Sequence, residues 1–259
     1  MKSRTKLTAS VAILAAIAPL TSAQAQNIVL EEIIVTAERR EQNLQTTPIA
    51  VTALSALQME RRNITETMDL GRQVPLLIAY NNVTLGASLA YWLRGIGSTE
   101  SLSTFDPPVL TYVDEIANPR QNANNLELVE IERMEVLRGP QGTLFGRNTT
   151  GGAVNIVTKK PGDEFEARGE LGYGRFNEIR MKGSLNVPVT EKLLTKFSAF
   201  YKKDDGWQES IVDGEKYNFS ETLGLRAAIR ALPSDNVTWD FSANWSTQDH
   251  QNLQSAVDP

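Results

Sequence analysis

The sequence predicts an α+β domain followed by an antiparallel β-sheet of the kind that builds transmembrane barrels, and three features support this prediction. The first 25 residues have the pattern of an export signal. Residues 48–160 mix short strand-like and helix-like pieces with many glycines. From residue 163 onward apolar and polar residues alternate strictly. Because successive side chains of a strand point to opposite faces, such alternation gives each strand one apolar and one polar face.

The export signal has three parts in the expected order. Lys2, Arg4 and Lys6 form a basic start, an apolar stretch follows over residues 11–20, and residues 23–25 have the small-x-small form of a cleavage site. This order indicates a signal peptide over residues 1–25, the alternative being a short buried helix. Its removal takes the formal net charge from −5 to −8, and an acidic chain offers no broad basic surface for nucleic acid.

The composition argues against several classes of site. The 259 residues include no cysteine, so disulfides are excluded, and His250 is the only histidine. A zinc site or a Ser-His-Asp triad built on one histidine is improbable, and we therefore expect no metal, no cofactor and no enzyme. No apolar run reaches the roughly 18 residues of a transmembrane helix, so any membrane span must be made by strands.

The alternating region contains five runs that match the roughly 9–11 residues a tilted strand needs to cross a bilayer. The runs cover residues 165–173, 179–187, 193–201, 219–229 and 237–245. A soluble antiparallel sandwich also alternates, so the pattern alone leaves that alternative open. Five strands cannot close an outer-membrane barrel, which begins at about eight strands. If the barrel prediction is right, the chain as given is expected to be a fragment.

A short β-prone run lies just after the expected cleavage site. It consists of Glu31, Glu32, Ile33, Ile34, Val35, Thr36 and Ala37. A strand-forming stretch near a free terminus is suited to adding an edge strand to the sheet of a partner, because main-chain hydrogen bonds supply the affinity. The alternative is an ordinary first strand of the following domain.

A longer motif runs from Ile131 to Lys159. Residues 133–137 are expected to form a strand, residues 139–142 a turn, residues 143–146 one helical turn, and residues 153–158 a second strand. Its high glycine content suits a backbone packed in a confined space. A phosphate-binding loop is disfavoured because Gly146 is followed by Arg147 and Asn148 and the segment leads into a strand, whereas a Walker loop needs Gly-Lys-Ser/Thr leading into a helix.

Both segments resemble elements of the TonB-dependent outer-membrane receptors. The run over residues 31–37 resembles the TonB box, and the motif over residues 131–159 resembles the signature near the end of the plug domain. Residues 93–96 resemble the arginine-glycine element of the plug, and residues 48–55 resemble its opening strand. The motif residues carried over are Arg94, Gly95, Glu132, Arg133, Glu135, Arg138, Gly139, Pro140, Gly142, Gly146, Gly151, Gly152 and Asn155.

The resemblance implies a domain layout. Residues 26–47 would be a periplasmic segment that contains the TonB box, residues 48–160 an α+β plug, and residues 163–259 the first strands of a transmembrane barrel, truncated in this chain. A plugged barrel of 22 strands is expected for the complete protein. The resemblance also suggests that the plug arginines Arg94, Arg138 and Arg147 meet carboxylates of the barrel wall beyond Pro259, the alternative being solvated surface charges.

The function implied by the resemblance is active uptake of a scarce nutrient across the bacterial outer membrane. Ferric siderophores are the default cargo, while cobalamin, other metal complexes and carbohydrates remain open. Energy would come from TonB with its ExbB–ExbD motor, and outer-membrane lipid would surround the barrel. A passive porin and a barrel enzyme are the rival functions. A porin needs neither a box nor a separate domain, and a plug would obstruct the lumen of an enzyme.

Overall fold

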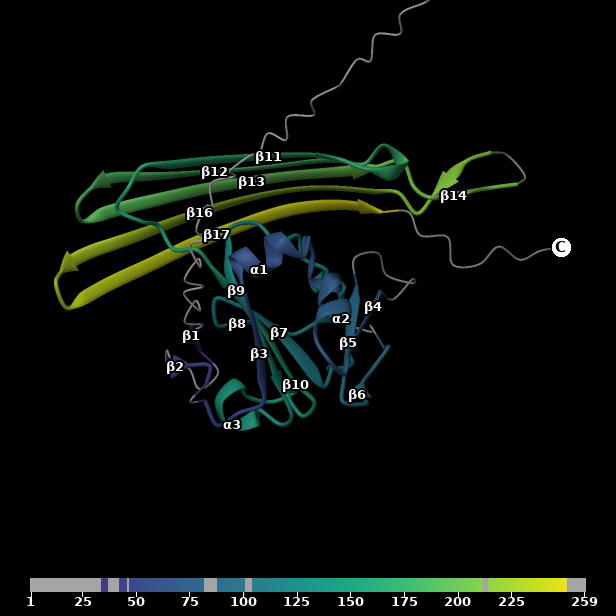
Figure 1. Cartoon of the computed structure of the whole chain (residues 1–259), viewed down its shortest axis with the longest axis horizontal. Coiled ribbons are helices and arrows are strands. Elements are labelled where there is room, and N and C mark those ends of the chain that lie inside the picture. Colours follow the sequence, from purple (N-terminus) through teal and green to yellow (C-terminus); the bar gives the residue numbers. More distant parts are fainter. Residues whose placement is uncertain are drawn as a thin grey trace, which may run out of the picture. The chain divides into compact units, whose positions relative to one another are not determined.

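The computed structural model describes residues 34–36, 42–45, 47–81, 88–100, 104–211 and 214–250. The expected signal peptide lies outside the described residues, as do Glu31, Glu32, Ile33 and Ala37 of the expected TonB box. Figure 1 shows two groups of elements, an α+β region between β3 and β10 and a sheet of long strands from β11 to β17. We call this second sheet the wall sheet.

The α+β region is built on a five-stranded mixed sheet with the order β3-β9-β10-β7-β8. Its central strand β10 runs parallel to β7 and antiparallel to β9, whereas β3 and β8 are antiparallel edge strands. The strands are β3 (Val51–Ser55), β7 (Val109–Val113), β8 (Ile116–Asn118), β9 (Ile131–Arg138) and β10 (Gly152–Thr158). The strands expected within the 131–159 motif and at residues 48–55 are therefore present.

Short helices and a small antiparallel sheet complete this region. Helix α1 begins after Ser55, whose side chain accepts the N–H of Gln58 while the Gln58 side chain accepts the N–H of Ser55, a capping box. The bounds are α1 (Ala56–Arg61), a 3₁₀ turn (Thr67–Asp69), α2 (Leu70–Gln73), β4 (Leu77–Asn81), β5 (Leu89–Leu93), β6 (Ile96–Gly97), a second 3₁₀ turn (Gln121–Ala123) and α3 (Gly142–Phe145). Helix α3 is the single helical turn expected at residues 143–146.

The mixed sheet has a hydrophobic core on each face, because successive side chains of β9 point alternately to its two faces. Met134 and Val136 pack into a cluster with residues of α2, β4 and β5. Leu137 belongs to a second cluster, which includes Tyr112, Phe145 and Val35. Both faces of β9 are therefore buried, as in a central strand.

The wall sheet is an antiparallel meander in chain order, β11-β12-β13-β16-β17. Its strands are β11 (Glu166–Tyr173), β12 (Ile179–Thr190), β13 (Leu193–Asp204), β16 (Ser220–Ser234) and β17 (Val237–His250). They cover the five alternating runs except for Phe165 and Phe219, and all but β11 extend beyond the C-terminal end of the run. A small hairpin of β14 (Gln208–Glu209) and β15 (Lys216–Tyr217) lies between β13 and β16.

The central strands of the wall sheet expose their apolar face and turn their polar face toward the α+β region. The edge strands β11 and β17 are exposed along most of both faces. Leu171 is 82% exposed and Phe197 and Leu225 are each 50% exposed, whereas Lys196 and Ser198 on the opposite face are 5% and 7% exposed. A soluble sandwich would do the reverse, because its inward face forms the core. The orientation is that of a barrel wall in lipid, and the predicted fold class is confirmed. Within the described residues, no helix is long and apolar enough to cross a membrane.

Gly152 is the position where the fold depends most directly on the lack of a side chain. Its φ is +147°, and an added Cβ would lie 2.3 Å from the carbonyl oxygen of Leu137. We expect Gly152→Ala to destabilise the protein by about 1–3 kcal/mol, since both strain and overlap oppose it. Calorimetry on the full-length protein in detergent would measure this. Gly169→Ala is the matched control, because a Cβ there meets nothing within 4 Å; equal stability of the two variants would contradict the account.

Candidate functional site

The segment Ile34–Thr36 is docked on the α+β region through Val35 and Thr36. Strand β1 (Ile34–Val35) pairs antiparallel with β2 (Gln42–Asn43), and this pair forms a two-stranded sheet apart from the mixed sheet. Val35 has no exposed surface and packs in the cluster that contains Leu137 and Phe145. The segment is therefore held by the buried side chain of Val35 and by the short β1–β2 hairpin, and it forms no backbone ladder with the mixed sheet.

Thr36 provides the second anchor, in a polar cluster with Arg133, Glu135 and Asn155. Its backbone N–H donates to Glu135 Oε1 at 2.8 Å and its hydroxyl donates to the same oxygen at 3.0 Å. The hydroxyl oxygen also accepts from Asn155 Nδ2 at 3.2 Å and from Arg133 Nη2 at 3.4 Å. We call these four residues the Thr36 cluster.

Glu135 is the centre of the Thr36 cluster, and its carboxylate is fully buried. Arg133 Nε lies 2.9 Å from Glu135 Oε1, and Asn155 Nδ2 donates to Oε2 at 3.3 Å. A buried carboxylate is tolerated only with such partners. The register of the sheet brings them together, because Asn155 is directly opposite Glu135 across β9 and β10 and Arg133 lies two residues earlier on the same face. Three of the motif residues thus form one site.

The glycine-rich turn of the motif lies at the other end of β9 and β10. Gly139 N–H donates to Gly151 O at 3.0 Å, which closes the turn. The guanidinium of Arg94 lies next to this turn, since a Cβ added to Gly139 would be 4.0 Å from Arg94 Nη1. A Cβ added to Gly151 would be 3.0 Å from Ile96 Cγ2. The arginine-glycine element at residues 93–96 and the signature turn therefore pack together.

The remaining motif residues lie outside the Thr36 cluster. Arg138 Nη2 donates to Thr52 Oγ1 at 2.7 Å, so its partner here belongs to the α+β region itself. Glu132 is exposed and forms an ion pair with Arg133. The other motif residues in this group are exposed, and they lie in turns or at the ends of helix α3: Arg94, Gly95, Pro140, Gly142 and Gly146.

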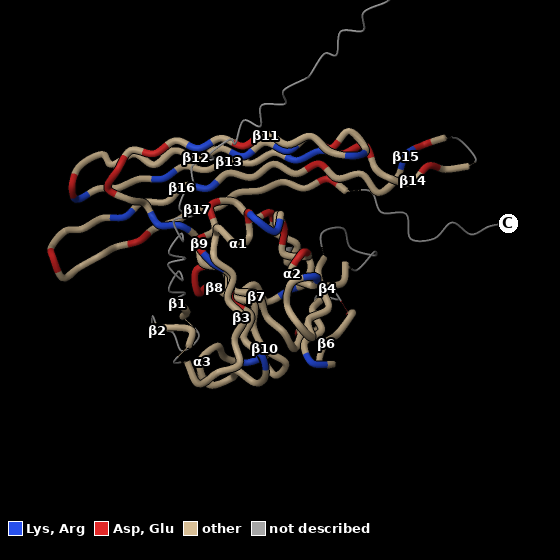
Figure 2. Tube along the Cα trace, viewed as in Figure 1, with Lys and Arg blue, Asp and Glu red and all other residues tan. Residues whose placement is uncertain are grey.

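The α+β region meets the wall sheet through buried ion pairs in which it supplies the carboxylates. The pairs are Lys196 Nζ to Glu130 Oε2 at 2.5 Å, Lys202 Nζ to Glu127 Oε1 at 2.9 Å, and Arg226 Nη2 to Asp114 Oδ2 at 2.7 Å. Figure 2 shows Lys and Arg recurring along the strands of the wall sheet. Among the described residues, these pairs involve other side chains than Arg94, Arg138 and Arg147, whose pairing with barrel carboxylates stays a prediction.

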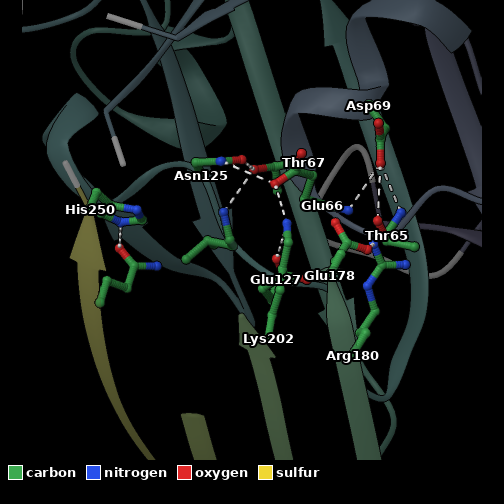
Figure 3. A network of polar contacts seen from close by, with 12 residues as sticks. Thr65, Glu66, Thr67, Asp69, Asn125, Glu127, Glu178, Arg180, Lys202 and His250 are labelled. Atoms are coloured by element: carbon green, nitrogen blue, oxygen red, sulfur yellow. Dashed lines mark hydrogen bonds and ion pairs between the residues drawn. The ribbon is translucent and has the colours of Figure 1, made fainter. Parts of the chain in front are cut away.

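The two glutamates of this interface respond differently to burial. Burial raises the pKa of the Glu127 carboxyl above its ordinary value, and the Lys202 ammonium opposes that rise only in part. Burial also acts on Glu130, but the hydrogen bond from Lys196 and the charge of Lys159 outweigh it, so the pKa of Glu130 lies below its usual range. Figure 3 shows Lys202 reaching toward Glu127. The wall cations Lys202 and Lys196 favour the ionised forms of the two carboxylates, and Lys159 of the α+β region adds to this effect at Glu130.

Sequence reasoning missed these interface carboxylates. A usable signal was present, because lysines occupy the polar face of the wall strands at residues 182, 196 and 202, and glutamates stand at 127 and 130 just before the motif. No group of three or more His, Cys, Asp or Glu side chains suited to a metal ion occurs among the residues that the structure describes. This arrangement holds the α+β region against the wall sheet through paired charges.

Comparison with known proteins identifies the family. Residues 43–153 match the model of the TonB-dependent Receptor Plug Domain. The pesticin receptor of Yersinia enterocolitica is 30% identical over 88% of this chain and 33% of the relative. The vitamin B12 transporter BtuB of Vibrio vulnificus is 23% identical over 83% of this chain and 35% of the relative. The chain thus spans about a third of the length of these relatives, which are receptors and transporters rather than enzymes.

Solved structures agree with the sequence matches. The ferric yersiniabactin uptake receptor FyuA from Yersinia pestis superposes with a TM-score of 0.69 at 26% identity, covering 77% of this chain and 32% of that chain. The pyoverdine outer membrane receptor FpvA from Pseudomonas aeruginosa gives a TM-score of 0.67 at 18% identity, covering 82% and 30%, which supports the fold alone. The chain therefore belongs to the TonB-dependent receptors of the bacterial outer membrane.

Proposed function

We propose that the protein imports a scarce nutrient across the outer membrane by TonB-coupled active transport. The observation that carries this proposal is the orientation of the wall sheet, which buries a cationic polar face against the α+β region and exposes an apolar face. The ion pairs would hold the α+β region against the wall of such a barrel at rest. Import then requires the α+β region to shift, and the shift requires an energy source.

Residues 31–37, which we call the coupling segment, are proposed to receive that energy from TonB and its ExbB–ExbD motor. Support comes from the way Ile34–Thr36 is attached, since this stretch is not a strand of the mixed sheet. A segment held by side chains and a short hairpin can leave without breaking the sheet, and its backbone is then free to pair with the sheet of a partner.

For the cargo we propose a ferric siderophore. Among the relatives, FyuA is described as a ferric yersiniabactin uptake receptor and FpvA as a receptor for pyoverdine, whereas BtuB carries vitamin B12. Cobalamin is therefore the second candidate. A deletion strain would be compared with the same strain carrying the receptor, each grown on a single iron or cobalamin source. The true cargo should support growth only of the strain that carries the receptor.

The rival functions fit the arrangement less well. A passive porin needs an open lumen, while here an α+β region is ion-paired to the wall sheet. A barrel enzyme would have to reach its substrate past the same region. We also propose the domain bounds expected from the sequence, with a signal peptide over 1–25, a periplasmic segment over 26–47, a plug over 48–160 and barrel strands from 163. Arg94, Arg138 and Arg147 are proposed to meet carboxylates of the barrel wall.

The lipid-facing assignment of the wall sheet predicts how a charge is tolerated there. Leu225 lies in the interior of β16 and is 50% exposed on the apolar face. Leu225→Arg in the full-length protein should weaken insertion by roughly 2–4 kcal/mol, the cost of an arginine near the bilayer midplane. Folding titrations into lipid vesicles would measure this, with Leu225→Phe as the control. Equal insertion of both variants would show that this face does not meet lipid.

The coupling role predicts a separation of uptake from binding. Ile34→Pro removes a backbone donor of the coupling segment and fixes its φ near −65°. We expect this variant to lose uptake of the iron complex while the affinity of cells for the complex stays within about twofold, and Ile34→Ala to retain uptake because its backbone can still pair. The measurement is radiolabelled uptake beside equilibrium binding at low temperature. Loss of both activities would indicate a purely structural strand, and normal uptake in Ile34→Pro would remove the coupling role.

A further inference from the structure

We propose that Glu66 and Glu127 form a proton-binding site between the α+β region and the wall sheet, and that proton uptake there strengthens the attachment of the two. The site consists of two neighbouring carboxylates and one ammonium group that they share, Lys202 of β13. Figure 3 shows these three residues close together. Neither the coupling segment nor the cargo takes part in the site.

The backbone places the two carboxylates opposite each other. Glu66 and Glu127 form an antiparallel bridge, and the residues on either side of them are joined by backbone hydrogen bonds of 3.0 Å and 2.8 Å. Residues that lie between two such bonds are a non-hydrogen-bonded pair, in which the side chains come closest. Like charges directly opposite each other are destabilising. The bridge therefore holds two negative charges close together.

A single ammonium group serves both carboxylates. Lys202 Nζ lies 2.9 Å from Glu127 Oε1 and 3.6 Å from Glu66 Oε2. The side chain of Glu127 is only 6% exposed, and its Oε2 has no hydrogen-bond partner in the part of the chain that the structure describes. A buried carboxylate oxygen that lacks a donor favours the neutral, protonated form of the group.

The surrounding charges place the proton on Glu127 rather than on Glu66. Burial raises the pKa of the Glu127 carboxyl, and the negative charge of Glu66 adds to the rise, while the ammonium groups of the wall oppose it only in part. The side chain of Glu66 is 24% exposed, and its Oε2 accepts from Asn125 Nδ2 at 3.2 Å. Glu66 thus remains available as the ionised partner of Lys202. The wall lysines that act on Glu127 are Lys182 and Lys202, and the further charged groups around them are Glu170, Glu178, Arg180, Asp204 and His250.

The sign of the pH dependence follows from these contacts. Release of the α+β region would return Glu127 to water, where its pKa is ordinary, so the attached state binds the proton more tightly. The attachment therefore gains stability as the pH falls toward the ordinary glutamate value of 4.5, and it loses that gain as the pH rises through the higher pKa of the attached state. Glu130 has the opposite sign, because its pKa is lowered in the attached state. Acidic surroundings would thus hold the α+β region more firmly through Glu127.

The experiment compares the natural full-length receptor in detergent with Glu127→Gln, which mimics the protonated carboxyl. Hydrogen exchange of the β9 amides reports the opening of the α+β region, and comparison at the same pH cancels the intrinsic pH dependence of exchange. We expect the protection of β9, natural over variant, to rise severalfold from about pH 7.5 to about pH 5, with a limit of about tenfold per pH unit for uptake of one proton. A ratio that stays constant or falls over this range would overturn the proposal.

Glu130→Gln is the matched control, because the same measurement should give a ratio that falls as the pH falls. A second variant, Glu66→Gln, keeps the test decisive if Glu127→Gln does not fold. It removes the neighbouring negative charge and leaves Lys202 to Glu127 alone, so it should weaken proton binding at Glu127. The protection of β9, natural over Glu66→Gln, should then also rise on acidification. A flat ratio for this variant would contradict the role of the carboxylate pair.

Discussion

Carboxylates of the α+β region neutralise cations on the buried face of the wall sheet, and the rest of the arrangement depends on this neutralisation. Strict alternation commits every second wall residue to the apolar side, so the remaining residues must face inward. Several of these are lysine or arginine, which are almost never buried without a partner. Glu130, Glu127 and Asp114 supply the partners. An α+β region without them would leave buried cations unpaired, and the wall could not bury its polar face.

The α+β region is attached to the wall sheet and to the coupling segment by different kinds of interaction. The attachment to the wall consists of buried ion pairs, whose separation is costly on both sides. The attachment of the coupling segment consists of one apolar side chain and the hydrogen bonds of Thr36, and its loss leaves Glu135 with Arg133.

Much of this architecture could be predicted from the sequence, because local patterns determine it. The alternation of the wall strands and the strand-turn-strand course of residues 131–159 follow from periodicity and glycine placement, and the opening strand β3 follows from the resemblance of residues 48–55 to the plug. The pairing of Glu135 with Asn155 could not be predicted, since it depends on the register between β9 and β10. The partners of Lys196 and Lys202 could not be predicted for a similar reason. These ion pairs join residues that are distant in the chain, and an alternating pattern predicts the face on which a side chain lies but not the residue opposite it.

The most direct test of this account is a double-mutant cycle on Glu130 and Lys196 in the full-length receptor. Denaturant unfolding of Glu130→Gln, Lys196→Gln and the double variant gives the interaction free energy between the two side chains. Glu130→Gln takes away the carboxylate that pairs with Lys196, and Lys196→Gln leaves Glu130 with Lys159 at 4.0 Å as its remaining cation. The account therefore predicts that the double variant loses less stability than the sum of the two single losses, by about 1–3 kcal/mol. Losses that add to within roughly 0.3–0.5 kcal/mol would mean that the two groups do not interact, and would contradict the claim that the α+β region is held to the wall by these pairs.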